Sequence, residues 1–172
     1  MPCITKHLFI VLISLFYNFS FCNETEDLDY ISILNKPFFS INSPDRQITL
    51  SGETSSFHGS SEFIIQIPNF KLDTNKLSVN INSKDAIYNK NNGFIKFKDS
   101  VKLQSLSKKD NLVISSEEII LNLTHETFSS TQEALTNLTD LEIKSLGIEM
   151  TQKRGNLNAE FSKGSFEIKN VG

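Results

Sequence analysis

Apolar and polar residues alternate in short runs from Gln47 to Ile168, and this pattern strongly limits the folds open to the chain. Examples are Leu77-Ser-Val79-Asn-Ile81 and Ile119-Ile-Leu121-Asn-Leu123. Successive side chains of a β-strand leave opposite faces of the sheet, so a period of two predicts strands with one buried and one wet face. We therefore expect an all-β domain with no helix beyond the N-terminal segment.

The pattern predicts about fifteen short strands, most of them separated by turn residues. They cover residues 38–41, 47–50, 62–67, 70–72, 77–81, 86–88, 94–97, 101–106, 112–115, 118–123, 128–130, 140–143, 148–151, 156–161 and 165–168. So many strands in one small domain favour a sandwich, a jellyroll or an open barrel. The end strands of such a stack carry unpaired N–H and C=O groups to which another chain can add a strand.

The N-terminal segment, residues 1–22, is apolar, and Lys6 is the only Lys, Arg, Asp or Glu within it. As a helix, Leu8 to Cys22 would span roughly 22 Å, less than the roughly 30 Å of a bilayer core, which suits a signal peptide. Ser20 and Cys22 are small residues at the −3 and −1 positions for cleavage before Asn23. A membrane anchor and a cleaved signal both remain open. We expect an acidic tether at 23–36 and a single domain at 37–172.

Composition argues against several classes of function. The net charge of −3 does not suit nucleic acid. Both cysteines, Cys3 and Cys22, belong to the N-terminal segment, and His58 and His125 have no metal-ligand partner nearby in the sequence. Neither a Gly-x-Ser-x-Gly elbow nor a phosphate-binding glycine loop occurs. We expect no enzyme activity, no cofactor and no metal site.

Four segments in the middle of the chain share a repeating layout: Asp85-Ala-Ile-Tyr88, residues 94–97, Asp99-Ser-Val101-Lys-Leu103 and Ser116-Glu-Glu-Ile119-Ile-Leu121-Asn-Leu123. This layout resembles that of periplasmic β proteins of lipopolysaccharide transport. The C-terminal part is similar in order and spacing to LptC proteins, with Leu146-Gly147-Ile-Glu-Met150 followed by residues 155–161 and 165–168. The resemblance covers residues 42–170. It departs from the family at Pro44-Asp45-Arg46 and at Ser100, where members often carry glycine.

The resemblance implies a single β-jellyroll in the periplasm, preceded by one N-terminal hydrophobic helix that holds it in the inner membrane. The implied function is lipopolysaccharide transport without catalysis. The protein would accept lipopolysaccharide from the ATP-driven LptB/LptF/LptG transporter, hold its acyl chains inside the jellyroll and pass it to LptA. One alternative is a soluble LptA-like bridge with a cleaved signal peptide. An alternative of another class is a periplasmic β module that binds protein and no lipid.

Two sets of site residues follow from the resemblance and the alternation together. The expected lipid-binding face consists of apolar side chains at alternate positions, for each of which ordinary dry core is the alternative: Phe63, Ile65, Ile67, Val79, Ile81, Ile95, Phe97, Val101, Leu103 and Ala159. Partner contacts are expected at both edges. Phe38, Phe39 and Ile41 would dock on LptF and LptG. Ser165, Phe166, Glu167 and Ile168 would pair with LptA, with Gly147 at a turn on which assembly depends.

Overall fold

The computed structural model describes residues 33–58, 61–107, 111–139, 141–153 and 156–168. The predicted N-terminal helix and most of the predicted tether lie outside these residues. The described part belongs to one compact unit, Ile31–Gly172. It is all-β and antiparallel, as the alternation predicts. A search of these residues for a helix long and apolar enough to cross a membrane finds none.

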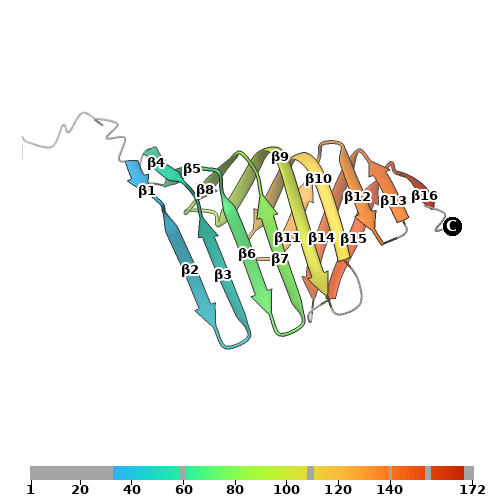
Figure 1. Ribbon diagram of the computed structural model, residues 1–172, viewed down its shortest axis with the longest axis horizontal. Helices are drawn as coiled ribbons and strands as arrows, with labels where there is room; N and C mark the ends of the chain where they lie inside the picture. Colours follow the sequence, from blue (N-terminus) through green and yellow to red (C-terminus); the bar gives the residue numbers. More distant parts are fainter. Residues whose placement is uncertain (1–32, 59–60, 108–110, 140, 154–155, 169–172) are drawn as a thin grey trace, which may run out of the picture. The chain divides into compact units, whose positions relative to one another are not determined.

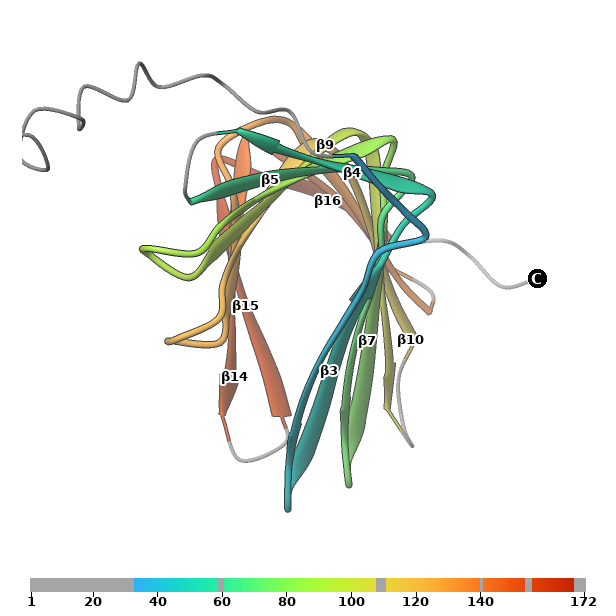
Figure 2. The same ribbon diagram turned by 90° about the vertical axis from the view of Figure 1, so that its left-hand side faces the viewer.

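The strands form two walls that meet along one side (Figures 1 and 2). The first wall contains β1 (Ile33–Asn35), β4 (Thr54–His58), β5 (Glu62–Gln66), β8 (Asp85–Asn89), β11 (Thr127–Ser130), β14 (Gly147–Lys153) and β15 (Asn156–Ser162). The second wall contains β2 (Phe38–Ser43), β3 (Arg46–Ser51), β6 (Asn69–Thr74), β7 (Leu77–Asn82), β12 (Ala134–Leu138), β13 (Leu141–Ser145) and β16 (Ser165–Ile168). Two long strands, β9 (Phe94–Ser107) and β10 (Asn111–Asn122), run through both walls.

Between the walls the chain turns a short corner, and the hydrogen-bond ladder continues around it. The Ile67 N–H donates to the Lys84 carbonyl at 2.7 Å, and the Lys84 N–H donates to the Asp99 carbonyl at 3.1 Å. Ile67, Asp99 and Ser100 bend the backbone through the left-handed region, with φ of 48°, 62° and 58°. Because the backbone groups stay paired through the bend, the walls are one folded sheet with a closed side and an open side.

The corners correct part of the sequence prediction. Residues 94–97 and 101–106 belong to one strand, β9, and residues 112–115 and 118–123 belong chiefly to another, β10. The register of this pair shifts between Ser116 and Glu118, where a β-bulge makes the bend. Strands β1, β4 and β12 were not predicted. Strand β1 falls within the range predicted as a tether. This segment is a strand because it pairs with β4 at the edge of the first wall.

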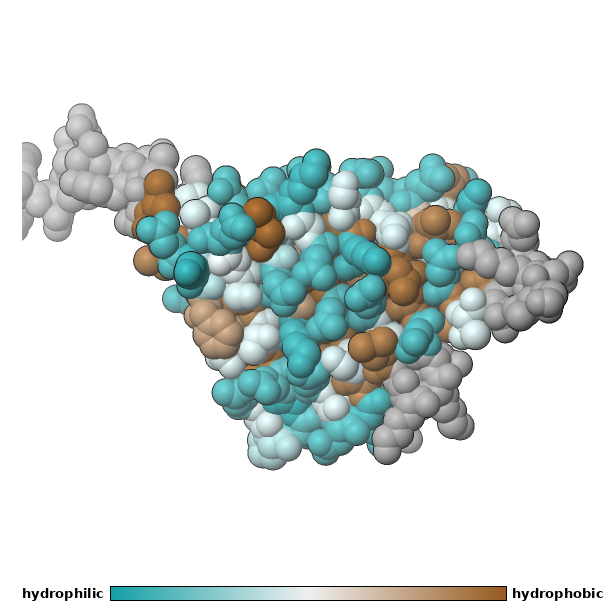
Figure 3. All heavy atoms as spheres, viewed as in Figure 1, coloured by the Kyte–Doolittle hydropathy of each residue, from teal (hydrophilic) through white to brown (hydrophobic). Residues whose placement is uncertain are grey.

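The core fills the space between the walls. Cross-strand partners share a face, so the buried residues form continuous rows: Phe70, Ile81, Leu103 and Ile114 on the second wall, and Ile65, Ala86, Phe97 and Ile119 on the first. The rings of Phe70 and Phe97 join the walls in an edge-to-face contact at 5.8 Å. Burial of each such side chain contributes about 1.5–3 kcal/mol. The outer face over β2, β3, β6 and β7 is mostly hydrophilic (Figure 3).

Candidate functional site

An apolar groove opens between the two walls near their N-terminal end, with a volume of about 390 Å³. Edge strand β2 and its neighbour β3 supply one side, and β8, β9 and the residue that follows β10 supply the other. The lining residues are Phe38, Phe39, Ser40, Ile41, Ile48, Leu50, Tyr88, Ile95 and Leu123. Ile48 and Leu50 alternate with polar residues on β3, so the period of two directs both side chains inward.

A cluster of aromatic rings packs behind the groove lining. Phe63 of β5 lies 5.9 Å from Phe39 at an interplanar angle of 81°, and it lies 5.8 Å from Tyr88. Phe57 of β4 packs on the other side of Phe63 at 4.5 Å. The Phe39–Phe63 contact joins the second wall to the first, because β2 and β5 belong to different walls. Edge-to-face pairs of this kind hold ring positions beyond simple burial, so the groove has a defined inner surface.

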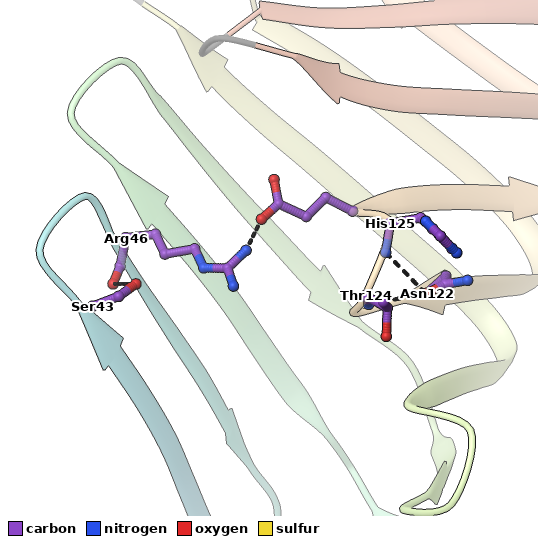
Figure 4. Close-up of polar contacts among 6 residues, drawn as sticks. Ser43, Arg46, Asn122, Thr124 and His125 are labelled. Atoms are coloured by element: carbon purple, nitrogen blue, oxygen red, sulfur yellow. Dashed lines mark hydrogen bonds and ion pairs between the residues drawn. The ribbon is translucent and has the colours of Figure 1, made fainter.

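An ion pair spans the open side just beyond the groove (Figure 4). Arg46 of β3 binds Glu126, which lies in the turn between β10 and β11. Arg46 precedes Ile48 by two residues and therefore faces inward with it, at the rim of the second wall. The backbone N–H groups of Thr124 and His125 donate to the Asn122 Oδ1 atom at 2.9 and 3.1 Å, and these bonds order the turn that presents Glu126.

The groove has the chemistry of a binding site for an apolar chain. Its lining contains no charged side chain, and polar atoms come only from Ser40, Tyr88 and the backbone. Apolar burial is non-directional and scales with area, so the site suits a flexible hydrocarbon better than a polar ligand. Among the described residues, no cluster of three His, Cys, Asp or Glu side chains could hold a metal ion.

Nine of the ten predicted lining residues lie on the inward rows, although only Ile95 lines the groove itself. Ile65, Val79, Ile81, Phe97, Val101 and Leu103 are buried in the core beside it, and Phe63 and Ala159 are partly buried. Ile67 is the exception, because it ends up at a corner with 56 % of its surface exposed. That strand, β5, ends at Gln66, one residue earlier than predicted.

Groove residues Ile48, Leu50, Tyr88 and Leu123 were not among the predicted site residues. The sequence contains two patterns that place three of them on an inward face. Ile48 and Leu50 alternate within the predicted strand at 47–50, and Tyr88 follows Ala86 by two residues on the same face. The pairing of Tyr88 with Ile95 and of Leu50 with Phe39 brings them to the groove, and pairing register is not readable from one sequence.

The predicted partner residues lie at the two ends of the folded sheet. Phe38 and Ile41 on edge strand β2 are exposed by 68 % and 51 %, and Ile33 on edge strand β1 is exposed by 66 %. At the other end, β16 pairs only with β13 within the described residues, through registers such as Ser165 with Lys144. Only the backbone of Phe166, Glu167 and Ile168 is described.

Gly147 is the first residue of β14, directly after a corner, and it is buried. A Cβ atom at this position would meet the Ser130 carbonyl oxygen at 3.1 Å, which is a tight contact with backbone. A side chain here therefore requires β14 and β11 to move apart by a few tenths of an ångström. A large side chain at this position would strain the pairing of these strands as well as any contact with a partner.

Buried hydroxyls replace some apolar side chains of the interior, at Ser55 and Ser105 and at four positions nearer the C-terminal end. Ser116 and Ser130 contact each other through their Oγ atoms at 3.1 Å. Thr136 and Ser145 are also buried, and their hydroxyl oxygens have no hydrogen-bond partner among the described residues. A further hollow of about 530 Å³ lies at the bend of β9 and β10. Its lining includes the charged side chains of Lys102, Glu117 and Glu133, which suit an acyl chain less well than the uncharged groove does.

Comparison with known protein families gives a match over more than half of the chain. Residues 53–159 fit the family described as lipopolysaccharide-assembly, LptC-related. The matched range begins directly after the corner at Gly52 and continues into β15, so it covers most of both walls. A search of curated proteins finds no match to this chain.

Proposed function

The chain belongs to the LptC family, whose role is in lipopolysaccharide transport, and from this premise we propose that the groove holds lipid acyl chains. In this proposal the domain receives lipopolysaccharide at its N-terminal end from the LptB/LptF/LptG transporter and passes it toward LptA at its C-terminal end. The N-terminal segment tethers the domain to the inner membrane. No step of catalysis is required of the chain.

One observation carries the proposal: the groove draws apolar side chains from both walls and leads into continuous apolar rows. Ile95 lines the groove, and its cross-strand partner Leu121 is buried in the next strand of the same row. Each acyl CH₂ group that leaves water gains about 0.8 kcal/mol, so a chain of ordinary length has a substantial driving force to enter. The sugars of the lipid would remain in solvent at the open side.

The strand edges at both ends leave room for a partner at each end, as the proposed transfer requires. Strand β2 carries apolar side chains on an unpaired edge, which suits docking by strand addition to a periplasmic domain of the transporter. The same edges also suit a module that binds protein and no lipid, and an LptA-like bridge with a cleaved N-terminus would use them in the same way. Lipid occupancy and the size of the mature chain distinguish these three cases.

Photo-crosslinking in cell membranes tests the proposal. Benzoylphenylalanine replaces the aromatic groove residues Phe39 and Tyr88, and control probes replace Thr49 and Lys71, which alternate with inward residues and so face outward. We expect lipopolysaccharide adducts at positions 39 and 88 and none at 49 or 71. Full-length protein on the same gel would support the anchored form. Absence of adducts at both groove positions, or equal adducts at the outward positions, would overturn the proposal.

A further inference from the structure

The Arg46–Glu126 ion pair bridges the open side next to the groove, and its two members come from different walls. Arg46 continues the inward row of β3 beyond Ile48, and Glu126 lies three residues after Leu123; both Ile48 and Leu123 line the groove. Lys71–Asp73 and Lys96–Glu118, by contrast, each join residues of one wall. An acyl chain that extends from the groove past Ile48 and Leu123 would have to move the Arg46 and Glu126 sides apart.

Separation of the rims would leave the Arg46 guanidinium without its carboxylate. Its side chain is only 34 % exposed, so water would compensate for the loss incompletely. Guanidinium offers a planar fork of N–H donors that fits carboxylate and phosphate alike, and such charge-assisted bonds are the stronger class of hydrogen bond. A lipid whose chains enter the groove brings its headgroup to this rim. An anionic headgroup would then restore the lost ion pair.

We propose that Glu126 occupies an anion site on Arg46 when the groove is empty, and that a phosphate of the lipid headgroup replaces it when acyl chains enter. This inference rests on the proposed lipid function. It assigns Arg46 as a headgroup-binding residue and Glu126 as its internal competitor. The exchange makes entry selective, because a lipid without an anionic headgroup breaks the ion pair without replacing it.

The turn that carries Glu126 suits a carboxylate that binds Arg46 in the empty groove and releases it when lipid enters. Asn122 orders the turn through bonds to two backbone N–H groups. Glu126 itself has a φ of 53°, in the left-handed region that residues other than glycine adopt at a cost. The carboxylate lies against Arg46 at the end of this ordered turn, and its side chain remains 28 % exposed, so it can rotate into solvent.

Two single substitutions distinguish this exchange from a simple latch, that is, an ion pair that only holds the two walls together. In the full chain, capture of fluorescent lipid A is measured for Arg46→Gln and Glu126→Gln, with Lys71→Gln on the outer face as the matched control. A simple latch would make both variants capture lipid more tightly. Exchange predicts opposite signs: Glu126→Gln strengthens capture and Arg46→Gln weakens it by about tenfold, the scale of one charge-assisted bond. Lys71→Gln should match the unchanged protein.

Two further arms identify the anion. With enzymatically dephosphorylated lipid A, the weakening by Arg46→Gln should disappear. Inorganic phosphate at the same concentration as the lipid should not compete, because it buries no acyl chain. Equal weakening for both lipids, or effective competition by inorganic phosphate, would overturn the headgroup assignment. If the unchanged protein captures neither lipid while its thermal unfolding is normal, the proposed function itself fails, and this inference with it.

Discussion

The edge-to-face contact between Phe70 and Phe97 should stabilise the folded sheet by coupling its two walls. Both side chains are fully buried, their ring centroids lie 5.8 Å apart, and β6 belongs to the second wall while this part of β9 belongs to the first. Phe→Leu at either position keeps an apolar side chain of nearly the same volume, so each single change should lower the free energy of unfolding by roughly 1.5 kcal/mol. The lost aromatic contact is shared between them and is worth about 0.5–1.5 kcal/mol.

A double-mutant cycle followed by urea denaturation measures that coupling. The cost of Phe70→Leu with Phe97→Leu should be smaller than the sum of the single costs by about 0.5–1.5 kcal/mol. Phe128 is buried and makes no ring contact with Phe70 among the described residues, so Phe70→Leu with Phe128→Leu should be additive within about 0.5 kcal/mol. If the Phe70–Phe97 cycle is also additive within that limit, this contact does not join the walls and the reasoning is refuted.

Two other predictions concern a corner and an outer-face carboxylate. At Gly52, between β3 and β4, a Cβ atom would lie 2.8 Å from the Gln66 carbonyl oxygen and would overlap Ile65 Cγ2. Gly52→Ala should therefore destabilise the fold by about 1–3 kcal/mol in thermal unfolding, and a neutral result would refute the close approach. Burial alone would raise the pKa of Asp73, but hydrogen bonds from Lys71 and Ser78 and the Lys71 charge bring the pKa below its ordinary 3.8. The ionised carboxylate therefore stabilises the fold above pH 3.8, and this contribution is lost as the pH falls through the lowered pKa. Asp73→Asn should lower the free energy of unfolding by about 0.2–1 kcal/mol at pH 7 and leave it unchanged at a pH where Asp73 is protonated. An equal loss at both pH values would contradict the assignment.

Alternation along the sequence predicted most strands but could not separate hairpins from corners. Asp99-Ser100 resembles any polar turn, yet here it bends one strand from the first wall into the second. Strand β4 was missed because its sequence, Thr-Ser-Ser-Phe-His, contains one large apolar residue, and pairing with β5 rather than propensity holds it. Tertiary pairing thus decided the features that local pattern left ambiguous.

In the candidate site, too, the sequence predicted the local features but not those that depend on tertiary pairing. Residues such as Ile65 and Phe97 could be predicted to point inward because a period of two determines the face of each side chain. The groove could not be predicted, because it depends on how Leu50 and Tyr88 of different walls approach each other. The ion pair was equally hidden: Arg46 and Glu126 lie far apart in the sequence, and only the fold brings the two rims together.

The corners also determine how such a domain can change in length. Each strand of one wall leads through a corner into the other, so the chain forms a stack of bent layers spaced about 4.8 Å apart. Removal of one layer would reverse the chain direction of every later layer and present the C-terminal edge with the opposite polarity. Removal or duplication of two layers together, for example from β5 to β8 (Glu62–Asn89), preserves it. Natural variants of this architecture should therefore differ in reach by steps of roughly 10 Å, with both end surfaces unchanged.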